Sequence, residues 1–362
     1  LSAWWSQQPS QVSDHGLLPT VAETPASSSK PSLIEAALAR LHDRPASAVD
    51  PSGLTRVPLD EIGLTNLEPL LGHAEYRLIR VYQAIRAGDS RQALDMAERL
   101  ARDHPNFQLA QLLTLRTRPI RTLGDVSDIE AQAAAAQLES LREESRRRIR
   151  ALTERPPEGR VPRQFLALSS QSRHAIAIDA SRSRLYLFEN LTATAPGGPD
   201  PAAAPRLRLV GDYYISVGLQ GIEKQIEGDQ RTPLGVYYIT STLDPRKLPD
   251  LYGVGALPIN YPNALDQQRG KTGSGIWLHG TPREQFVRAP QASDGCVVLS
   301  NQDLEFLLKT VRIRTTPVVI AQHLEWVAPS SLDQERQNFA QALDAWREAR
   351  STGDIQGLRA LY

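Results

Sequence analysis

The segments GSGIWLHGT (residues 273–281) and ASDGCVVLSNQDL (residues 292–304) hold the most informative residues of this 362-residue chain. Residues 275–279 read as a β-strand that ends at His279, and the following Gly280-Thr281 predicts a turn that lets the imidazole face a cleft. Cys296 comes 17 positions later, after Ser-Asp-Gly and before an apolar run. This spacing leaves room for a loop that folds back and brings the two side chains together.

Cys296 is the only cysteine of the chain. A thiol becomes a useful nucleophile when it is partly exposed and lies beside a base or a cation, and His279 is the candidate base. Gly295 permits a tight turn whose backbone amides could point at a developing oxyanion. A lone cysteine is also commonly a small buried hydrophobic residue. The residues alone therefore leave both interpretations open.

Taken together, His279-Gly280-Thr281 and Ser293-Asp294-Gly295-Cys296 resemble the signature of L,D-transpeptidases with a YkuD-type catalytic domain. Upstream, EGDQRTPLGVYYI (residues 227–239) is similar to the family's Gly-Asp-x-Arg-Thr-Pro-x-Gly segment, which suits a structural turn that braces the site. The resemblance covers residues 172–321. It implies an α+β protein whose catalytic domain is a mostly antiparallel, YkuD-like β-sandwich.

The resemblance implies a reaction on bacterial peptidoglycan that needs no metal and no organic cofactor. Cys296 would attack the carbonyl of the third stem-peptide residue, a diaminopimelate, and expel the terminal D-alanine. His279 would act as general acid and base, and the backbone carbonyl of Gly295 or Ser293 would orient its imidazole. Backbone amides of the turn at Asp294 would hold the oxyanion. An amine of a second stem peptide would then form the crosslink.

Two positions depart from the family's pattern. Asp294 stands where many members have histidine, and Val298 stands where an arginine often helps to position substrate. A different cation must then meet the carboxylates of the substrate. The candidates are Arg283, Arg288, Arg269 and Lys271. Tyr252 and Trp277 are candidates for the walls of a peptide groove, although aromatic residues at such positions also serve packing.

Three functions remain open at this level. The first is an L,D-transpeptidase of the periplasm or cell envelope that acts in cell-wall organisation and cell shape and reacts with carbapenems. The second is a hydrolase with the same site, either a carboxypeptidase or endopeptidase or an enzyme that releases lipoprotein, in which water resolves the acyl-enzyme. The third is an inactive scaffold that binds the cell wall.

Composition excludes several other classes. Lys+Arg 41 and Asp+Glu 41 give a formal net charge of +0, which argues against a nucleic-acid-binding protein. One cysteine excludes an intramolecular disulfide and multi-cysteine metal sites, and the histidines lack ligand spacing. No apolar run approaches the length of a membrane span. The chain begins at Leu1 without the pattern of a signal peptide, so we expect that any such segment or anchor has been removed.

The composition and hydrophobic periodicity of the sequence predict four regions. Residues 1–32 form a flexible tail, and residues 33–156 form a helical domain with a tetratricopeptide-like hairpin around Gly88-Asp89. A surface for an envelope protein partner is expected on this helical domain. Residues 172–321 form the catalytic domain, and residues 330–362 form a C-terminal helical segment that we interpret as the start of a truncated domain. The strands and the helix expected in the catalytic domain are 174–179, 184–188, 207–217, 235–240, 275–279, 317–320 and the helix 301–311.

Overall fold

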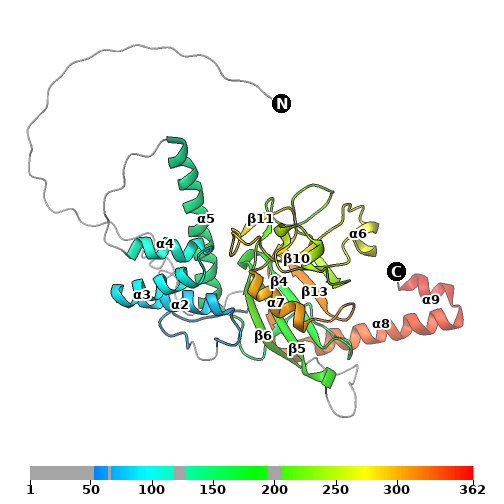
Figure 1. Cartoon of the computed structure of the whole chain (residues 1–362). Coiled ribbons are helices and arrows are strands. Elements are labelled where there is room, and N and C mark those ends of the chain that lie inside the picture. Colours follow the sequence, from blue (N-terminus) through cyan, green and yellow to red (C-terminus); the bar gives the residue numbers. More distant parts are fainter. Residues whose placement is uncertain (1–52, 64–66, 118–127, 195–205, 362) are drawn as a thin grey trace, which may run out of the picture. The chain divides into compact units, whose positions relative to one another are not determined.

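The computed structural model describes residues 53–63, 67–117, 128–194 and 206–361 (Figure 1). The predicted tail, and the helix expected to begin at Leu33, lie outside these residues. Residues 195–205 lie outside them as well.

The described residues before the β domain form four helices: α2 (His73–Arg86), α3 (Ser90–Asp103), α4 (Gln108–Thr117) and α5 (Asp128–Thr153). Leu78, Val81 and Tyr82 recur at helical spacing and are fully buried, so α2 packs through one face. The Asp89 carboxylate accepts a hydrogen bond from the Gln92 amide at 2.9 Å and caps α3. The sequence interpretation had not identified α4.

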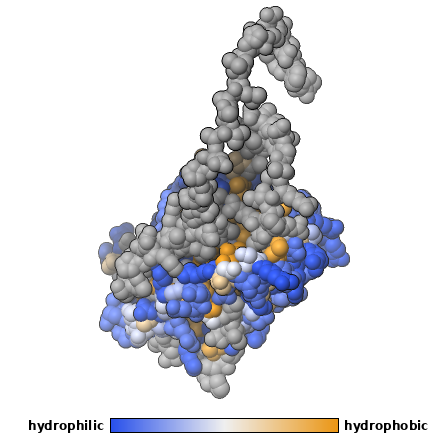
Figure 2. Space-filling model, turned by 90° about the vertical axis from the view of Figure 1, so that its left-hand side faces the viewer, coloured by the Kyte–Doolittle hydropathy of each residue, from blue (hydrophilic) through white to orange (hydrophobic). Residues whose placement is uncertain are grey.

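The outer side of these helices is polar. Figure 2 shows the side of the molecule that lies at the left of Figure 1, and its described residues are mostly hydrophilic. Three apolar residues of α3, Ala93, Ala97 and Leu100, are fully buried. Among the described helices, none is both long enough and apolar enough to cross a bilayer.

The catalytic region is built on a five-stranded sheet with the order β6-β5-β4-β13-β8. Its strands are β4 (His174–Asp179), β5 (Arg184–Asn190), β6 (Leu207–Tyr214), β8 (Gly235–Tyr238) and β13 (Pro317–Ala321). Both faces are covered, because Ile176 and Leu185 enter one core cluster while Ala177 and Tyr186 enter another. Burial of a side chain such as Ile176 contributes about 1.5–3 kcal/mol.

A smaller sheet faces the first across the larger core cluster. It has the order β12-β10-β9 and consists of β9 (Ala256–Pro258), β10 (Trp277–His279) and β12 (Val297–Val298). Leu257, Leu278 and Val297 place its inner face in the same cluster as Ile176. The α+β prediction is confirmed, with sheets that are mostly antiparallel but mixed, because β4–β13 and β10–β12 pair in parallel.

Shorter strands complete the β structure. Six strands have two or three residues each and form three pairs. The pairs are β7 (Val217–Gly218) with β11 (Gln291–Ser293), β1 (Thr55–Arg56) with β2 (Glu154–Arg155), and β3 (Val161–Pro162) with β14 (Trp326–Val327). The single strand expected at residues 207–217 is divided into β6 and β7. The remaining described α-helices are α6 (Ala264–Gln268), α7 (Asn301–Thr310), α8 (Asp333–Thr352) and α9 (Ile355–Ala360).

Helix α8 is attached at its first turn to the segment that precedes the catalytic region. The buried guanidinium of Arg336 donates a hydrogen bond from Nε to the backbone oxygen of Leu166 at 2.9 Å. Further along, Phe339 is exposed, and Leu343 and Trp346 are half-buried. These three apolar side chains recur at helical spacing, and they lie largely at the surface of the described residues.

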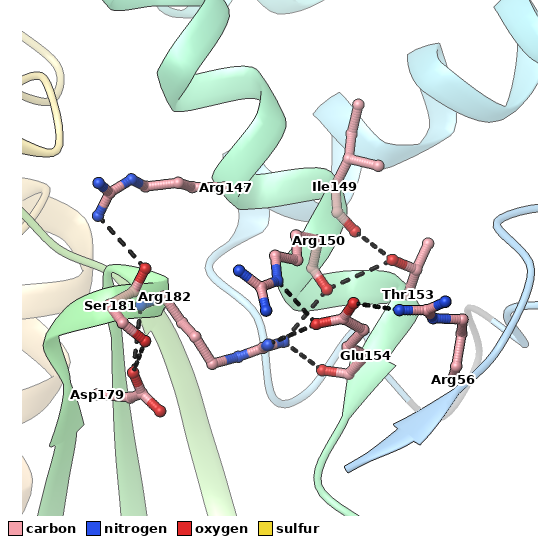
Figure 3. A network of polar contacts seen from close by, with 9 residues as sticks. All are labelled: Arg56, Arg147, Ile149, Arg150, Thr153, Glu154, Asp179, Ser181 and Arg182. Atoms are coloured by element: carbon pink, nitrogen blue, oxygen red, sulfur yellow. Dashed lines mark hydrogen bonds and ion pairs between the residues drawn. The ribbon is translucent and has the colours of Figure 1, made fainter. Parts of the chain in front are cut away.

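A polar network joins the end of α5 to the catalytic sheet (Figure 3). The Glu154 carboxylate accepts hydrogen bonds from Arg56 at 2.9 Å and from Arg150 and Arg182 at 2.8 Å each. Burial alone would raise the pKa of Glu154, but the bonds from Arg150 and Arg182 lower it to about 2. Glu154 is therefore ionised at neutral pH and holds α5, β1 and the turn after β4 together.

Candidate active site

The register of the smaller sheet places the candidate nucleophile and base on one face. Strands β10 and β12 run in parallel, with Leu278 beside Val297, and both of these side chains enter the core. Because side chains alternate along a strand, Trp277, His279 and Cys296 belong to the opposite face. The Trp277 amide donates a hydrogen bond to Cys296 Sγ at 3.4 Å.

Cys296 and His279 line the same pocket, which has a volume of about 220 Å³. Three further predicted residues, Tyr252, Arg288 and Asp294, also line it. The other lining residues were not predicted to line a pocket, although those at 227–228 and 273–276 lie in two of the segments quoted above; they are Lys224, Glu227, Gly228, Leu251, Gly273, Ser274, Gly275 and Ile276.

The imidazole of His279 is buried and its tautomer is determined by a backbone contact. Its Nδ1 lies 2.7 Å from the carbonyl oxygen of Gly280. A carbonyl can only accept, so Nδ1 carries the proton and Nε2 is left as the basic nitrogen. Burial lowers the pKa of His279 to about 4, although the bond to Gly280 favours the charged form. The imidazole is therefore uncharged at neutral pH, and its Nε2 carries no proton.

This contact differs from the one that the sequence predicted. The carbonyl of Gly295 or Ser293 was expected to orient the imidazole. The Gly295 oxygen instead accepts a hydrogen bond from Thr232 Oγ1 at 2.9 Å, and the Ser293 oxygen accepts one from the Leu219 amide at 2.7 Å. The carbonyl that contacts His279 belongs to the next residue in the chain, so a motif search for a third catalytic residue could not find it.

The Cys296 side chain is only partly exposed and lies between backbone groups. Its Sγ lies 3.4 Å from the carbonyl oxygen of Gly275, to which it can donate. Burial raises the pKa of the Cys296 thiol above its usual value and outweighs the lowering by the Trp277 amide and Arg288. The resting site is therefore a neutral thiol with a neutral imidazole, rather than a thiolate with an imidazolium.

This resting state predicts a particular pH dependence of alkylation. The rate at which iodoacetamide modifies Cys296 is expected to rise about tenfold per pH unit from pH 6 upward, because only the thiolate reacts. The rise should continue to a higher pH than for free cysteine, whose pKa is about 8.5. The measurement is the alkylation rate by intact mass between pH 5 and 10, and a plateau near neutral pH would instead indicate a stable thiolate.

The turn before Cys296 depends on glycine. Gly295 has φ +118°, and a Cβ at this position would lie 2.7 Å from the carbonyl oxygen of Arg231. Ser293 closes the turn, because its hydroxyl donates to the Cys296 carbonyl at 2.6 Å and accepts from the Gly295 amide at 3.2 Å. The side chain of Ser293 thus shapes the loop that carries the thiol.

The GDQRTPLG segment supports this turn through hydrogen bonds. Thr232 is fully buried, and its hydroxyl accepts from the Gly218 amide and donates to the Gly295 carbonyl, both at 2.9 Å. Asp229 accepts from three backbone amides of its own loop and pairs with Lys224 at 2.8 Å. These contacts agree with the structural turn that the sequence predicted there.

Among the predicted cations, Arg288 alone lines the pocket. Its Nη1 reaches the Ala292 carbonyl at 3.4 Å, and the negative charge of Asp294 in the same pocket acts on it, although no ion pair within 4 Å joins Arg288 to a carboxylate of the described residues. The side chain of Arg283 is 93% exposed and lies 3.5 Å from Asp250. The other two candidates are also outside the pocket, since Lys271 pairs with Asp266 at 3.1 Å and Arg269 is exposed at the end of α6.

The two predicted aromatic residues contact each other. The Tyr252 ring lies 4.8 Å from the Trp277 ring and stands edge-on to the His279 imidazole at 5.0 Å. Tyr252 lines the pocket, while Trp277 is not among the lining residues and packs against Tyr252. The pair limits the freedom of the imidazole on one side.

Solved structures provide several similar proteins. The chain is 29% identical to Bd1075 of Bdellovibrio bacteriovorus over 56% of this chain and 68% of that chain, with a TM-score of 0.45. It is 25% identical to Pgp2, the helical cell shape determining protein of Campylobacter jejuni, over 52% and 60%, with a TM-score of 0.41. An L,D-transpeptidase of Mycobacterium tuberculosis H37Rv is 18% identical over 41% and 57%, with a TM-score of 0.26. The chain thus spans less than two thirds of the latter two.

Sequence comparison gives two further results. No curated protein matches the chain. The family model of the L,D-transpeptidase catalytic domain, YkuD, matches residues 173–320, which nearly coincide with the 172–321 expected from the motifs. The resemblance carried by the His279 and Cys296 motifs is thereby confirmed, and the chain contains an L,D-transpeptidase catalytic domain of the YkuD family.

Proposed function

We propose that this protein forms peptidoglycan crosslinks through a thioester on Cys296, with release of D-alanine from the stem peptide. The observation that carries the proposal is the neutral imidazole of His279, which shares a pocket with the only sulfur nucleophile and keeps Nε2 as its basic nitrogen. An unprotonated Nε2 in the same pocket can accept the proton of a thiol that is protonated at rest.

Acylation begins when the Cys296 sulfur attacks the carbonyl of the third stem-peptide residue while its proton passes to His279 Nε2. The backbone amides of residues 294–296 hold the oxyanion of the tetrahedral intermediate. Collapse breaks the peptide bond, and the leaving D-alanine amine takes the proton from Nε2. The bond from His279 Nδ1 to Gly280 keeps the imidazole oriented through both transfers.

Crosslinking follows the steps of acylation in reverse order, with a different amine. An amine of a second stem peptide attacks the thioester, and His279 accepts its proton and returns it to the sulfur. Both substrates belong to the cell wall, so we place the enzyme in the periplasm or cell envelope. We further propose that the helical region before residue 156 and the catalytic region 172–321 are separate domains of one enzyme.

Arg288 is the group that we assign to a carboxylate of the donor peptide, since it is a half-buried cation at the pocket that forms no ion pair with a carboxylate of the described chain. Arg288→Gln is expected to lower kcat/KM for a tetrapeptide donor about 10- to 100-fold, mainly through KM, because a charge-assisted hydrogen bond is worth about 1.5–3 kcal/mol. Arg283→Gln is the matched control, and steady-state kinetics compare the two. Equal effects of both variants would contradict the assignment.

The reaction type is tested with purified tetrapeptide muropeptides. We expect crosslinked dimers and free D-alanine in equal amounts, measured by chromatography and mass spectrometry. Trimmed monomers without dimers would favour a hydrolase, in which water replaces the amine. No turnover, together with no carbapenem adduct on Cys296, would favour an inactive wall-binding protein.

A further inference from the structure

The loop at residues 280–290, which connects His279 to β11 and carries Arg288, is held from outside by the helical region. Asn106 lies in the turn between α3 and α4, and its side-chain amide donates to the Arg283 carbonyl at 2.9 Å. In the opposite direction, the Phe286 amide donates to the Asn106 carbonyl at 3.2 Å. Two hydrogen bonds thus attach this loop to one residue far away in the sequence.

Aromatic packing reinforces this attachment. The Phe286 ring stacks on Phe107 with the centroids 4.5 Å apart, and it lies 5.0 Å from the His104 ring. Phe107 is fully buried, so its ring is fixed within the helical region. On the inner side, Thr281 Oγ1 donates to the Phe286 carbonyl at 3.2 Å, which links Phe286 to the residue two positions after His279.

A second contact holds Arg288 itself. The Tyr214 hydroxyl, at the end of β6, donates to the Arg288 carbonyl at 3.0 Å. The guanidinium of Arg148, from α5, lies 3.8 Å over the Tyr214 ring and is itself paired with Glu144 at 2.8 Å. The backbone of Arg288 is therefore fixed by a residue that α5 packs against.

We propose that the α3–α4 turn is a positioning element of the active site. Asn106 and Phe286 together hold the loop at residues 280–290, and this loop determines where the Arg288 guanidinium lies relative to Cys296. The assignment of Arg288 to a substrate carboxylate rests on the function proposed above, but the positioning itself does not. A loop of eleven residues has many accessible conformations, and anchoring both of its ends and its middle removes most of them.

The single cysteine provides a test that needs no substrate. Iodoacetate and iodoacetamide both react with the Cys296 thiolate and release iodide, so the ratio of their rate constants cancels the thiolate fraction and reports the local charge. Arg288→Gln should lower the iodoacetate-to-iodoacetamide ratio about three- to tenfold. In the full-length protein, Asn106→Ala and Phe286→Leu should each lower this ratio, but by less than Arg288→Gln does. Asn338→Ala, on the exposed face of α8, is the matched control and should leave it unchanged.

A double-mutant cycle separates positioning from general destabilisation. In the Arg288→Gln background, Asn106→Ala should cause no further decrease of the ratio, because the displaced charge is already absent. An unchanged ratio in Asn106→Ala and Phe286→Leu, or an equal decrease in both backgrounds, would overturn the proposal. Failure of the transpeptidase proposal would appear elsewhere, as absence of muropeptide turnover with the ratio still dependent on Asn106.

Discussion

Replacing Cys296 with alanine is expected to abolish acyl-enzyme formation and crosslinking. Cys296 is the only cysteine, so no neighbouring sulfur can take its place. Loss of a covalent nucleophile removes the thioester route entirely, and the expected decrease in kcat is at least about 10³-fold. Two measurements check this. Intact mass after incubation with a carbapenem should show one adduct on the wild-type protein and none on the variant, and muropeptide dimers should be absent.

Ser274 offers the matched control for this experiment. It lines the same pocket and carries a hydroxyl that could act as a nucleophile. Ser274→Ala is expected to retain both the carbapenem adduct and the dimers. An adduct that persists in Cys296→Ala and disappears in Ser274→Ala would show that the wrong residue had been identified.

Three of the strands that were predicted closely, β4, β5 and β13, carry apolar runs. β4 matches the predicted range 174–179, and β5 and β13 differ from prediction only at their ends. These strands are buried on both faces, so hydrophobicity alone identified them. β9, β11 and β12 have two or three residues each, which is too short for any periodicity to be recognised.

Only part of the site could be predicted from the sequence. The motifs identified Cys296 and His279, which line one pocket. Sequence could not separate Arg288 from Arg283, because both lie in the same loop and only the fold decides which of them faces the pocket. Lys224 was missed because it lies just before the recognised segment 227–239, and Glu227 begins that segment but was expected only to brace the site.

A buried ionic cluster connects the helical region to the catalytic sheet. Glu75 of α2 contacts Arg184 of β5 at 2.7 Å and Arg148 of α5 at 3.1 Å. Arg184 also contacts Asp212 of β6 at 2.7 Å through Nε and donates to its backbone oxygen at 2.8 Å. All four side chains are buried. Glu144 pairs with Arg148 at 2.8 Å and Arg155 with Asp212 at 3.2 Å, so the cluster holds three arginines and three carboxylates. Removal of one arginine leaves an excess negative charge away from water.

Arg184→Met is therefore expected to lower the free energy of unfolding by about 3–5 kcal/mol, because Glu75 and Asp212 would both lose a partner inside the protein. The exposed pair of Arg246 and Asp244, which are 2.6 Å apart, gives the matched control. Arg246→Met should lower the free energy of unfolding far less, since solvent screens that pair. Urea denaturation at pH 7 measures both, and hydrogen exchange in α2 should increase in Arg184→Met alone. Equal losses in the two variants would mean that the cluster adds no more to stability than a surface ion pair.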